Sequence, residues 1–296
     1  MKSKVLLFGA NGQLGTEFRQ AADAAGLPIT ALTRSDVDIA DPGAVQAALD
    51  RAQPSLVVNA AAYTRVDDAE IEREAAIRGN VTGPEALAKA CVRADAALVH
   101  ISSDYVFDGE KQGSYSETDA VAPIGFYGRT KADGEAAIRA NLARHVILRV
   151  SWLYGEFGNN FLKTMLRLAS QRDEIAVVAD QHGSPTSTKD VYRAIAAVAG
   201  QIERGGDIFG TYHFTGYGAT TWHGFAAAAL GKYGELTGRK INVRPITTAE
   251  YPTRTKRPAN STLDCSKFER TFGVRANFWR SEVEDTVERL VPKSAF

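Results

Sequence analysis

Short apolar runs alternate with amphipathic stretches along the first half of the chain. Five runs are rich in Leu and β-branched residues, as is typical of strands buried on both faces of a parallel sheet; they span residues 4–8, 28–32, 55–59, 97–101 and 145–149. Apolar residues at helical spacing fill the intervals, over residues 13–25, 42–52, 67–94 (with a break near Gly79) and 126–140. Asp41 and Pro42 have the residue types of an N-cap and a first helical position. This order predicts a Rossmann-type, doubly wound parallel sheet with right-handed crossovers.

The alternation is looser beyond residue 150. Helices are predicted over 160–170, 189–203 and 221–236, strands over 175–179 and 241–246, and two short helices near the end. We expect strand 175–179 and helix 189–203 to continue the architecture of the first half. The prediction is therefore an α/β fold with a main domain over 1–150, to which parts of 172–215 return. A smaller, partly interleaved C-terminal substrate domain would comprise 151–171 and 216–296.

Charge and composition exclude several classes of protein. Lys plus Arg and Asp plus Glu both number 35, which argues against nucleic acid or an anionic membrane as the main partner. No apolar run approaches the length of a membrane span, and no signal-peptide pattern is present. Cys91 and Cys265 lie far apart without Cys-x-x-Cys spacing, so we expect two packed thiols in a reducing, cytoplasmic compartment.

A glycine-rich stretch, FGANGQLG, follows the first predicted strand and opens the first predicted helix. Residues without a Cβ atom allow backbone N–H groups to approach a pyrophosphate, and the N-terminus of the helix stabilises its negative charge. The stretch therefore predicts a dinucleotide-binding main domain. The expected contacts are Gly9, Asn11, Gly12, Gln13, Leu14 and Gly15.

The end of the second predicted strand discriminates NAD from NADP. An acidic residue there binds the ribose 2′-hydroxyl, whereas a basic residue can accept the 2′-phosphate. Arg34 stands at this point and the first carboxylate is Asp36, so NADPH is favoured and NADH stays open. Asp38 and Ile39 could contact the adenine, although Asp38 could equally cap the turn before Asp41.

Three side chains form a candidate catalytic set. Ser103 follows the fourth predicted strand, and Tyr127 and Lys131 stand four positions apart in the next helix. Hydride addition to a carbonyl carbon leaves an alkoxide that needs a proton, and a phenol of pKa ~10 donates slowly near neutrality unless a close cation stabilises its phenolate. We expect Lys131 to be that cation and to bond the nicotinamide ribose, while Ser103 orients the carbonyl oxygen. The alternative is a solvated Tyr–Lys pair and a turn-forming Ser.

Together with FGANGQLG, the motifs HISSDYVFDG, YGRTKADGE, RVSWLYG, DQHGSPT and YPTRTKRPANSTLD extend over nearly the whole chain. On these motifs the chain resembles the extended short-chain dehydrogenase/reductase family and, within it, the dTDP-4-dehydrorhamnose reductases. The resemblance implies hydride transfer from NAD(P)H to the C4 ketone of dTDP-4-dehydro-L-rhamnose, giving dTDP-L-rhamnose. Tyr127 would be the acid, Lys131 its cation and Ser103 the third member, where the family more usually has Thr.

The resemblance also implies further binding residues. Ala60, Ala61 and Ala62 would line the cofactor. The substrate would meet Thr64, Val66, Ser103, Asp104, Tyr105, Trp152, Asn160 and Arg257. An aromatic ring such as Trp152 or Tyr105 can stack on a hexose, and Arg257, held extended by Pro258, is the candidate for the diphosphate. Core packing of the rings and a solvated loop arginine are the alternatives.

Some members of this family hold a divalent cation with glutamates at a dimer contact. Glu17 matches one such position, but Lys189 stands where a second carboxylate is expected, and the histidines lack ligand spacing. We therefore predict no metal. The expected partner is a dTDP-sugar, and a homodimer with a second copy of the chain stays open.

Three alternative functions share much of this sequence pattern. A sugar-nucleotide dehydratase needs Asp-Glu beside the strand-end hydroxyl, and the Asp104-Tyr105 pair found here disfavours it. A reductase of opposite C4 stereochemistry would give dTDP-6-deoxy-L-talose, and residue types do not distinguish the two. A non-catalytic NADP-binding subunit, like the regulatory subunit of methionine adenosyltransferase, would be expected to have lost part of the Ser/Tyr/Lys set, which is complete here.

Overall fold

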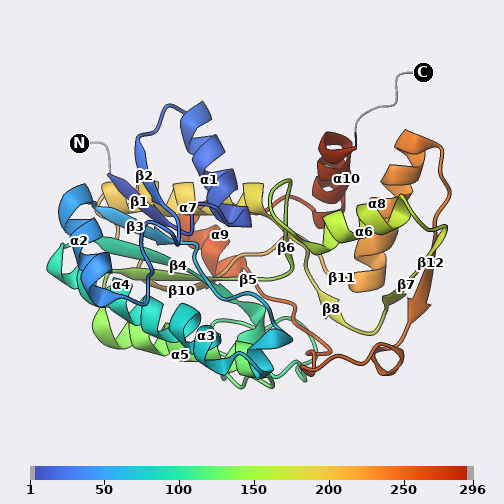
Figure 1. Cartoon of the computed structure of the whole chain (residues 1–296), viewed down its shortest axis with the longest axis horizontal. Helices are drawn as coiled ribbons and strands as arrows, with labels where there is room; N and C mark the ends of the chain where they lie inside the picture. Colours follow the sequence, from blue (N-terminus) through green and yellow to red (C-terminus); the bar gives the residue numbers. More distant parts are fainter. Residues whose placement is uncertain (1–3, 292–296) are drawn as a thin grey trace.

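The computed structural model describes residues 4–291, and its larger part is a parallel sheet covered by helices on both faces (Figure 1). The described residues form six strands in this sheet: β1 (Val5–Phe8), β2 (Ile29–Leu32), β3 (Leu56–Asn59), β4 (Ala97–Ser103), β5 (His145–Val150) and β10 (Gly210–His213). Their order across the sheet is β10-β5-β4-β3-β1-β2, and every neighbouring pair is parallel. The predicted Rossmann-type α/β fold is confirmed.

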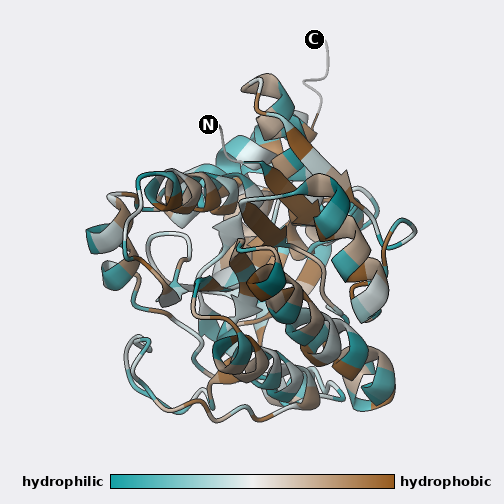
Figure 2. Cartoon of the chain, turned by 90° about the vertical axis from the view of Figure 1, so that its left-hand side faces the viewer, coloured by the Kyte–Doolittle hydropathy of each residue, from teal (hydrophilic) through white to brown (hydrophobic). Residues whose placement is uncertain are grey.

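Each face of the sheet has its own apolar core. One face packs against α1 (Gln13–Ala24), α7 (Thr188–Glu203) and α9 (Ser266–Phe272). The other packs against α2 (Pro42–Ala52), α4 (Gly83–Arg93) and α5 (Phe126–Asn141). Figure 2 shows the resulting arrangement, with brown, apolar strands between two layers of helices. Burial on both faces explains why these strands lack polar alternation in the sequence.

The segment between β3 and α4 contains short helical pieces in place of one long helix. They are a 3₁₀ turn (Asp68–Glu70), α3 (Arg73–Ile77) and a π-helical stretch (Arg78–Thr82) that runs directly into α4. The break predicted near Gly79 therefore falls in the π-helical stretch. A Cβ atom at Gly79 would lie 3.1 Å from the backbone nitrogen of Tyr63, so this close contact favours glycine.

A smaller group of elements lies beside the sheet, on the right of Figure 1. It contains the helices α6 (Phe161–Ala169), α8 (Trp222–Thr237) and α10 (Trp279–Leu290), which share apolar clusters. It also contains three two-stranded ladders: β7 (Glu174–Val178) with β12 (Asn242–Ile246), β8 (His182–Gly183) with β11 (Thr220–Thr221), and β6 (Leu153–Tyr154) with β9 (Thr186–Ser187). No helix in residues 4–291 is long and apolar enough to cross a bilayer.

One expectation about the main sheet is wrong. The strand predicted over 175–179 is β7, which pairs with β12 in the smaller group, whereas β10 is the strand that returns to the sheet, beside β5. Glu174 and Ala176 are exposed, whereas Ile175 and Val177 are buried. β7 therefore buries one of its two faces, unlike the strands of the main sheet, which are buried on both. β10 escaped prediction because Gly210–His213 is four residues long and carries little apolar pattern.

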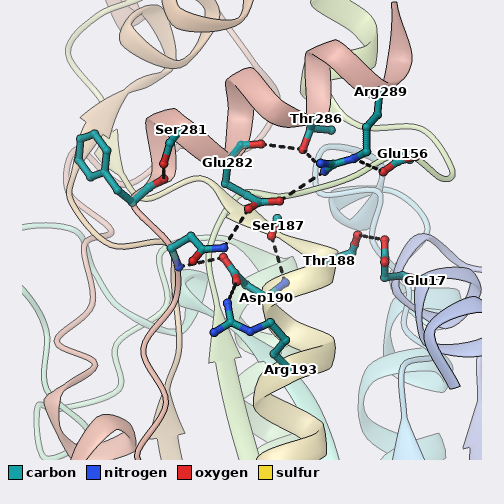
Figure 3. Close-up of polar contacts among 12 residues, drawn as sticks. Glu17, Glu156, Ser187, Thr188, Asp190, Arg193, Ser281, Glu282, Thr286 and Arg289 are labelled. Atoms are coloured by element: carbon teal, nitrogen blue, oxygen red, sulfur yellow. Dashed lines mark hydrogen bonds and ion pairs between the residues drawn. The ribbon is translucent and has the colours of Figure 1, made fainter. Parts of the chain in front are cut away.

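Polar side chains join the smaller group to the main sheet (Figure 3). The Asp190 carboxylate, at the start of α7, accepts from the Asn277 backbone N–H at 3.1 Å, and the Asn277 amide donates to Glu282 of α10 at 2.9 Å. Thr188, the first residue of α7, donates in turn to Glu17 of α1 at 2.9 Å, which joins two helices on the same face of the main sheet. The contacts of Asn277 with Asp190 and Glu282 therefore hold α10 against α7.

A buried ion pair ties α5 to the strands beneath it. The fully buried Glu135 carboxylate accepts from Arg149 Nε at 2.8 Å and from Arg149 Nη2 at 2.7 Å. Ser102 of β4 donates to the same carboxylate at 2.6 Å, and Arg139, which is partly exposed, donates at 3.1 Å. The pair therefore joins α5, β4 and β5 at one point.

Replacing Arg149 with Met is expected to lower the free energy of unfolding by about 3–5 kcal/mol, because Glu135 would keep a buried charge with only Arg139 beside it. Chemical denaturation measures this. The control is Arg144→Ala, which removes a pair with Asp95 whose side chains are 42% and 92% exposed, and should cost about 0–1 kcal/mol. Equal losses in the two variants would contradict the assignment.

Candidate active site

The order of the strands in the sheet reverses between β1 and β3, and ligands of doubly wound folds bind at such a point. Gly12 is the N-cap of α1 and offers no side chain to its free N–H groups. Gly9 has φ +83°, and a Cβ atom there would lie 2.5 Å from the Ala61 nitrogen. A Cβ atom at Gly15 would lie 2.1 Å from the Gly9 carbonyl oxygen. The glycine loop is thus a tight turn with bare backbone and a helix N-terminus, which fits a pyrophosphate.

The loop after β3 forms the other wall of this crevice. Ala60 donates its N–H to the Phe8 carbonyl at 3.0 Å, and Ala61 donates to the Asn59 side chain at 3.1 Å. Asn59 in turn contacts the His100 ring nitrogen Nδ1 at 3.0 Å. These bonds hold the predicted cofactor-lining segment, residues 60–62, against the glycine loop.

The loop after β2 contains the residues predicted to contact the 2′-phosphate and the adenine. Arg34 is exposed at the strand end, where a 2′-phosphate could be met. Asp38 uses one carboxylate oxygen to accept from the Ala40 N–H at 3.0 Å and the other to pair with Arg78 at 2.8 Å. The adenine contact predicted for Asp38 therefore competes with a turn-capping role, and the hydrogen bonds favour the cap. Ile39 is buried beneath Gly83.

The three candidate catalytic residues come from two neighbouring elements. Ser103 is the last residue of β4, and Tyr127 and Lys131 follow one another on the inner face of α5, all buried. The ring of Tyr105 meets that of Tyr127 edge to face, with centroids 5.8 Å apart. The Ser103 hydroxyl lies close enough to Tyr127 to lower its pKa. Ser103, Tyr127 and Lys131, which are separated in the sequence, thus lie where β4 ends and α5 begins.

Lys131 is held by the strand beneath it. Its ammonium group donates to the Ile101 carbonyl at 2.7 Å. Burial lowers the pKa of Lys131 to about 8, and the negative charge of Glu135, one turn further along α5, opposes that change. The Lys131 charge also contributes, after burial, to a lowered pKa of His100.

The pKa of Tyr127 lies above its ordinary value, opposite to the direction expected from a neighbouring cation. Burial is the main cause, the negative charge of Asp104 adds to it, and the Ser103 hydroxyl opposes it. Tyr127 is therefore fully protonated near neutral pH. That is the state in which a phenol can donate a proton.

Several predicted substrate residues gather beside Tyr127. Val66 and Tyr105 pack in the same apolar cluster as Tyr127. Arg257 donates to the Tyr105 hydroxyl at 3.3 Å, and its guanidinium pairs with Asp67 at 2.6 Å. The loop carrying Arg257 thus closes over the Tyr105 side of the site, and Asp67 holds the charge that we expected to meet a diphosphate.

Other predicted substrate residues lie apart from this cluster. Thr64 is exposed. Trp152 has φ +47°, stacks on Trp222 with centroids 3.7 Å apart, and lies so close to Gly183 that a Cβ atom there would be 2.5 Å from its ring. Asn160 caps α6 and donates to Gln13 of the glycine loop at 2.6 Å. Asn160 therefore links α6 of the smaller group to α1 on the main sheet.

The sequence did not point to several residues that shape the site. Asp67 accepts from the Thr255 N–H at 3.1 Å as well as from Arg257, and Glu70 accepts from the Phe126 N–H at 2.8 Å, next to Tyr127. The acidic run in VDDAE is the only local signal for them, and an acidic loop is usually solvated.

Residues 4–291 contain no group of three or more His, Cys, Asp or Glu side chains that could hold a metal ion. Glu17, the one position that matched a family metal ligand, hydrogen-bonds Thr188 (Figure 3). Cys91 and Cys265 are both free thiols, and burial raises the pKa of Cys265 to about 11.

A dinucleotide crevice, a buried tyrosine with a neighbouring lysine and serine, and a second group of elements beside them define an oxidoreductase of the extended short-chain type. A family model described as the RmlD substrate binding domain matches residues 3–291. The chain belongs to this family, that of the dTDP-4-dehydrorhamnose reductases.

Individual relatives agree over nearly the full length. The chain is 42% identical over 290 residues to the dTDP-4-dehydrorhamnose reductase of Aggregatibacter actinomycetemcomitans, covering 96% of this chain and 98% of that protein. It is 38% identical over 302 residues to that of Escherichia coli K12, covering 98% and 99%. The crystal structure of dTDP-4-dehydrorhamnose reductase from Bacillus anthracis in complex with NADP has a TM-score of 0.90 and 35% identity, covering 97% and 99%. A UDP-glucose 4-epimerase from Thermus thermophilus, 20% identical with a TM-score of 0.80, shares the fold.

Replacing Gly15 with Ala is expected to weaken NADPH binding by about tenfold or more, roughly 1.4 kcal/mol, because the new Cβ atom would displace the Gly9 carbonyl from beneath α1. Fluorescence titration with NADPH measures this. The control is Gly231→Ala in α8, where no atom lies within 4 Å of the added methyl group. It should leave binding unchanged and stabilise the helix by about 0.5–1 kcal/mol. Wild-type affinity in Gly15→Ala would contradict the crevice assignment.

Proposed function

We propose that this protein reduces the C4 ketone of dTDP-4-dehydro-L-rhamnose to dTDP-L-rhamnose with NADPH. The observation that carries this proposal is the buried Ser103–Tyr127–Lys131 set beside the glycine loop, in a chain that belongs to the reductase family over its full described length. The protein from Bacillus anthracis, of the same fold and length, has been solved with NADP. NADPH is accordingly the cofactor that we assign, and NADH stays possible.

The residues that would hold the cofactor are those of the crevice. Its pyrophosphate would lie on the backbone of the glycine loop, with Arg34 near the 2′-phosphate and residues 60–62 along the opposite wall. Lys131 would bond the nicotinamide ribose, since its ammonium group is anchored at the end of β4. When bound, NADPH supplies the hydride for the ketone carbon.

Tyr127 supplies the proton. Its raised pKa keeps the phenol protonated, so an alkoxide forming beside it can take the proton from the hydroxyl oxygen, leaving a phenolate. A protonated Lys131 lowers the cost of that phenolate in a low-dielectric site. Because the pKa of Lys131 is about 8, the lysine is charged below that pH and loses its proton above it. Ser103 would donate a hydrogen bond to the ketone oxygen and orient it.

The sugar nucleotide would lie between the Tyr105 side of the main sheet and the smaller group of elements, which we propose is the substrate domain. We expect Val66, Asp104 and Tyr105 to meet the sugar, and Arg257 could exchange Asp67 for the diphosphate. Trp152, already stacked on Trp222, would present the rest of its ring to the ligand. A homodimer and a cytoplasmic location stay predictions.

Two alternatives are weaker on the residues present. A non-catalytic NADP-binding subunit does not need a buried, protonated Tyr127 beside Ser103, and the set is complete. A reductase giving dTDP-6-deoxy-L-talose would use the same groups on the opposite face of the ketone. The measurement that separates them is NADPH oxidation with dTDP-4-dehydro-L-rhamnose, followed by NMR of the product at C4. We expect the rhamno configuration; NADPH binding without turnover would overturn the proposed function.

Replacing Tyr127 with Phe is expected to lower kcat by about 10²-fold or more, because the ring is kept and only the proton donor is lost. Stopped-flow or steady-state NADPH oxidation measures this. NADPH affinity should change little, which separates a chemical defect from misfolding. Tyr63→Phe, which removes a partly buried hydroxyl bonded to Glu72, is the matched control and should keep near wild-type kcat. Full activity in Tyr127→Phe would refute the mechanism.

A further inference from the structure

Asp104 follows Ser103 and is buried in a group of hydroxyls. Asp104 is only 3% exposed, and the Ser103 hydroxyl donates to its Oδ1 atom at 2.9 Å. Burial raises the pKa of Asp104 to about 6, and the groups that most oppose this rise are the hydroxyls of Ser261, Ser103 and Ser151. Among residues 4–291 the carboxyl accepts this one hydrogen bond, its Oδ2 atom has no partner, and no cation pairs with it. Such a buried carboxyl can change its charge near neutral pH.

The hydrogen bonds of Ser103 determine what this charge does. A serine hydroxyl has a single proton to donate. In the structure that proton goes to Asp104, while the Ser103 oxygen accepts from the Tyr105 N–H at 3.1 Å. The role proposed for Ser103 requires the same proton to point at the ketone oxygen. Ser103 cannot donate to Asp104 and to the ketone oxygen at the same time, so a neighbouring group must determine which of the two accepts its proton.

We propose that Asp104 is a positioning residue that acts through Ser103: its carboxylate form holds the Ser103 proton, and its neutral form releases that proton to the ketone. A carboxylate only accepts hydrogen bonds, whereas a neutral carboxyl has a proton of its own to donate, to Ser103 or to another nearby hydroxyl oxygen. No bond is made or broken in this step beyond the exchange of one hydrogen bond and one proton with solvent. The inference rests on the proposed reduction.

The charge of Asp104 acts on Tyr127 in the same direction. After burial, it is the largest contribution to the raised pKa of Tyr127. Neutral Asp104 therefore makes Tyr127 a stronger acid and also frees the Ser103 donor. Both effects predict a faster hydride step when Asp104 is protonated, that is, on the acid side of its pKa.

The other titratable groups facing this cluster change charge elsewhere. From the 3₁₀ turn at Asp104–Val106, Tyr105 has a raised pKa, to which burial contributes most; Arg257 and Asp67 act on it with opposite signs. From α5, Tyr127 also has a raised pKa, and Lys131 titrates at about 8. Ser151, after β5, and Ser261, in the loop that carries Arg257, contribute neutral hydroxyls. Between about pH 5 and 7, Asp104 is thus the group of this cluster that titrates.

The experiment measures the pH dependence of the hydride step in the full-length enzyme. NADPH oxidation with dTDP-4-dehydro-L-rhamnose is followed from pH 5 to 8, with NADPH and with NADPH deuterated at the transferred position, so that the isotope effect reports the chemical step. The wild-type rate should fall about threefold or more as pH rises through about 6. Asp104→Asn, which is neutral at every pH, should show no such fall below pH 7, whatever change in KM follows from its expected contact with the sugar.

A further variant separates this role from others. Ser103→Ala should lower the rate and weaken the dependence on pH. A wild-type pH profile in Asp104→Asn would overturn the inference. A change in KM alone, with the profile intact, would also overturn it, since Asp104 would then only contact the sugar.

A matched control uses Asp190, a second buried aspartate, 1% exposed, at the start of α7 (Figure 3). Asp190→Asn should keep the wild-type pH profile while losing stability, because it weakens the contacts to Arg193 and Asn277. Thermal unfolding of each variant identifies losses that come from folding. If the wild-type enzyme does not reduce the ketone at all, the proposed function fails; if it does and Asp104→Asn titrates like the wild type, only this inference fails.

Discussion

The buried ion pair between Glu135 and Arg149 is the interaction on which the site depends. A carboxylate removed from water is stable only when its lone pairs are filled, and Glu135 accepts from Arg149, Ser102 and Arg139. These bonds fix the rotation of α5 above β4 and β5. The same face of the helix carries Lys131 and Tyr127 at successive turns, so the ion pair that orients the helix also orients the catalytic side chains.

The site is completed by segments that are remote in the sequence. The Gly9 backbone lies against Ala60 and Ala61, and the loop carrying Thr255 and Arg257 is bonded to Asp67. Ser261, from that same loop, contributes to the environment of Asp104. A displacement of the loop would therefore change the contacts of the substrate side and the charge state of Asp104 together.

The sequence predicted the parts of the structure whose signals are local. Asp41 and Pro42 identified the start of α2, and the structure shows Asp41 accepting from two backbone N–H groups there. The main strands were recognisable because burial on both faces leaves a continuous apolar run. The positions of Ser103 and Tyr127 followed from the rule that ligands gather at the carboxyl ends of parallel strands.

What could not be predicted depends on distant partners. β10 has no apolar run, and it is a strand only because β5 offers it a free edge. β7 has the strand pattern, but nothing local says that its neighbour is β12. Arg257 is similar: a guanidinium in a loop suggests an anion, and only the fold shows that Asp67 is the anion it meets. The direction of the Tyr127 pKa was missed for the same reason, since it follows from burial and from Asp104.

The stacked pair of Trp152 and Trp222 gives the enzyme an optical property. The chain has three tryptophans, and two of them lie with ring centroids 3.7 Å apart at an interplanar angle of 12°. At that separation the two rings are in van der Waals contact, so a change at this point alters the surroundings of two of the three tryptophans at once. Trp152 is also held in a left-handed backbone conformation that bulky residues rarely adopt. Light absorbed by this pair therefore reports the strained corner where the main sheet passes into the smaller group of elements.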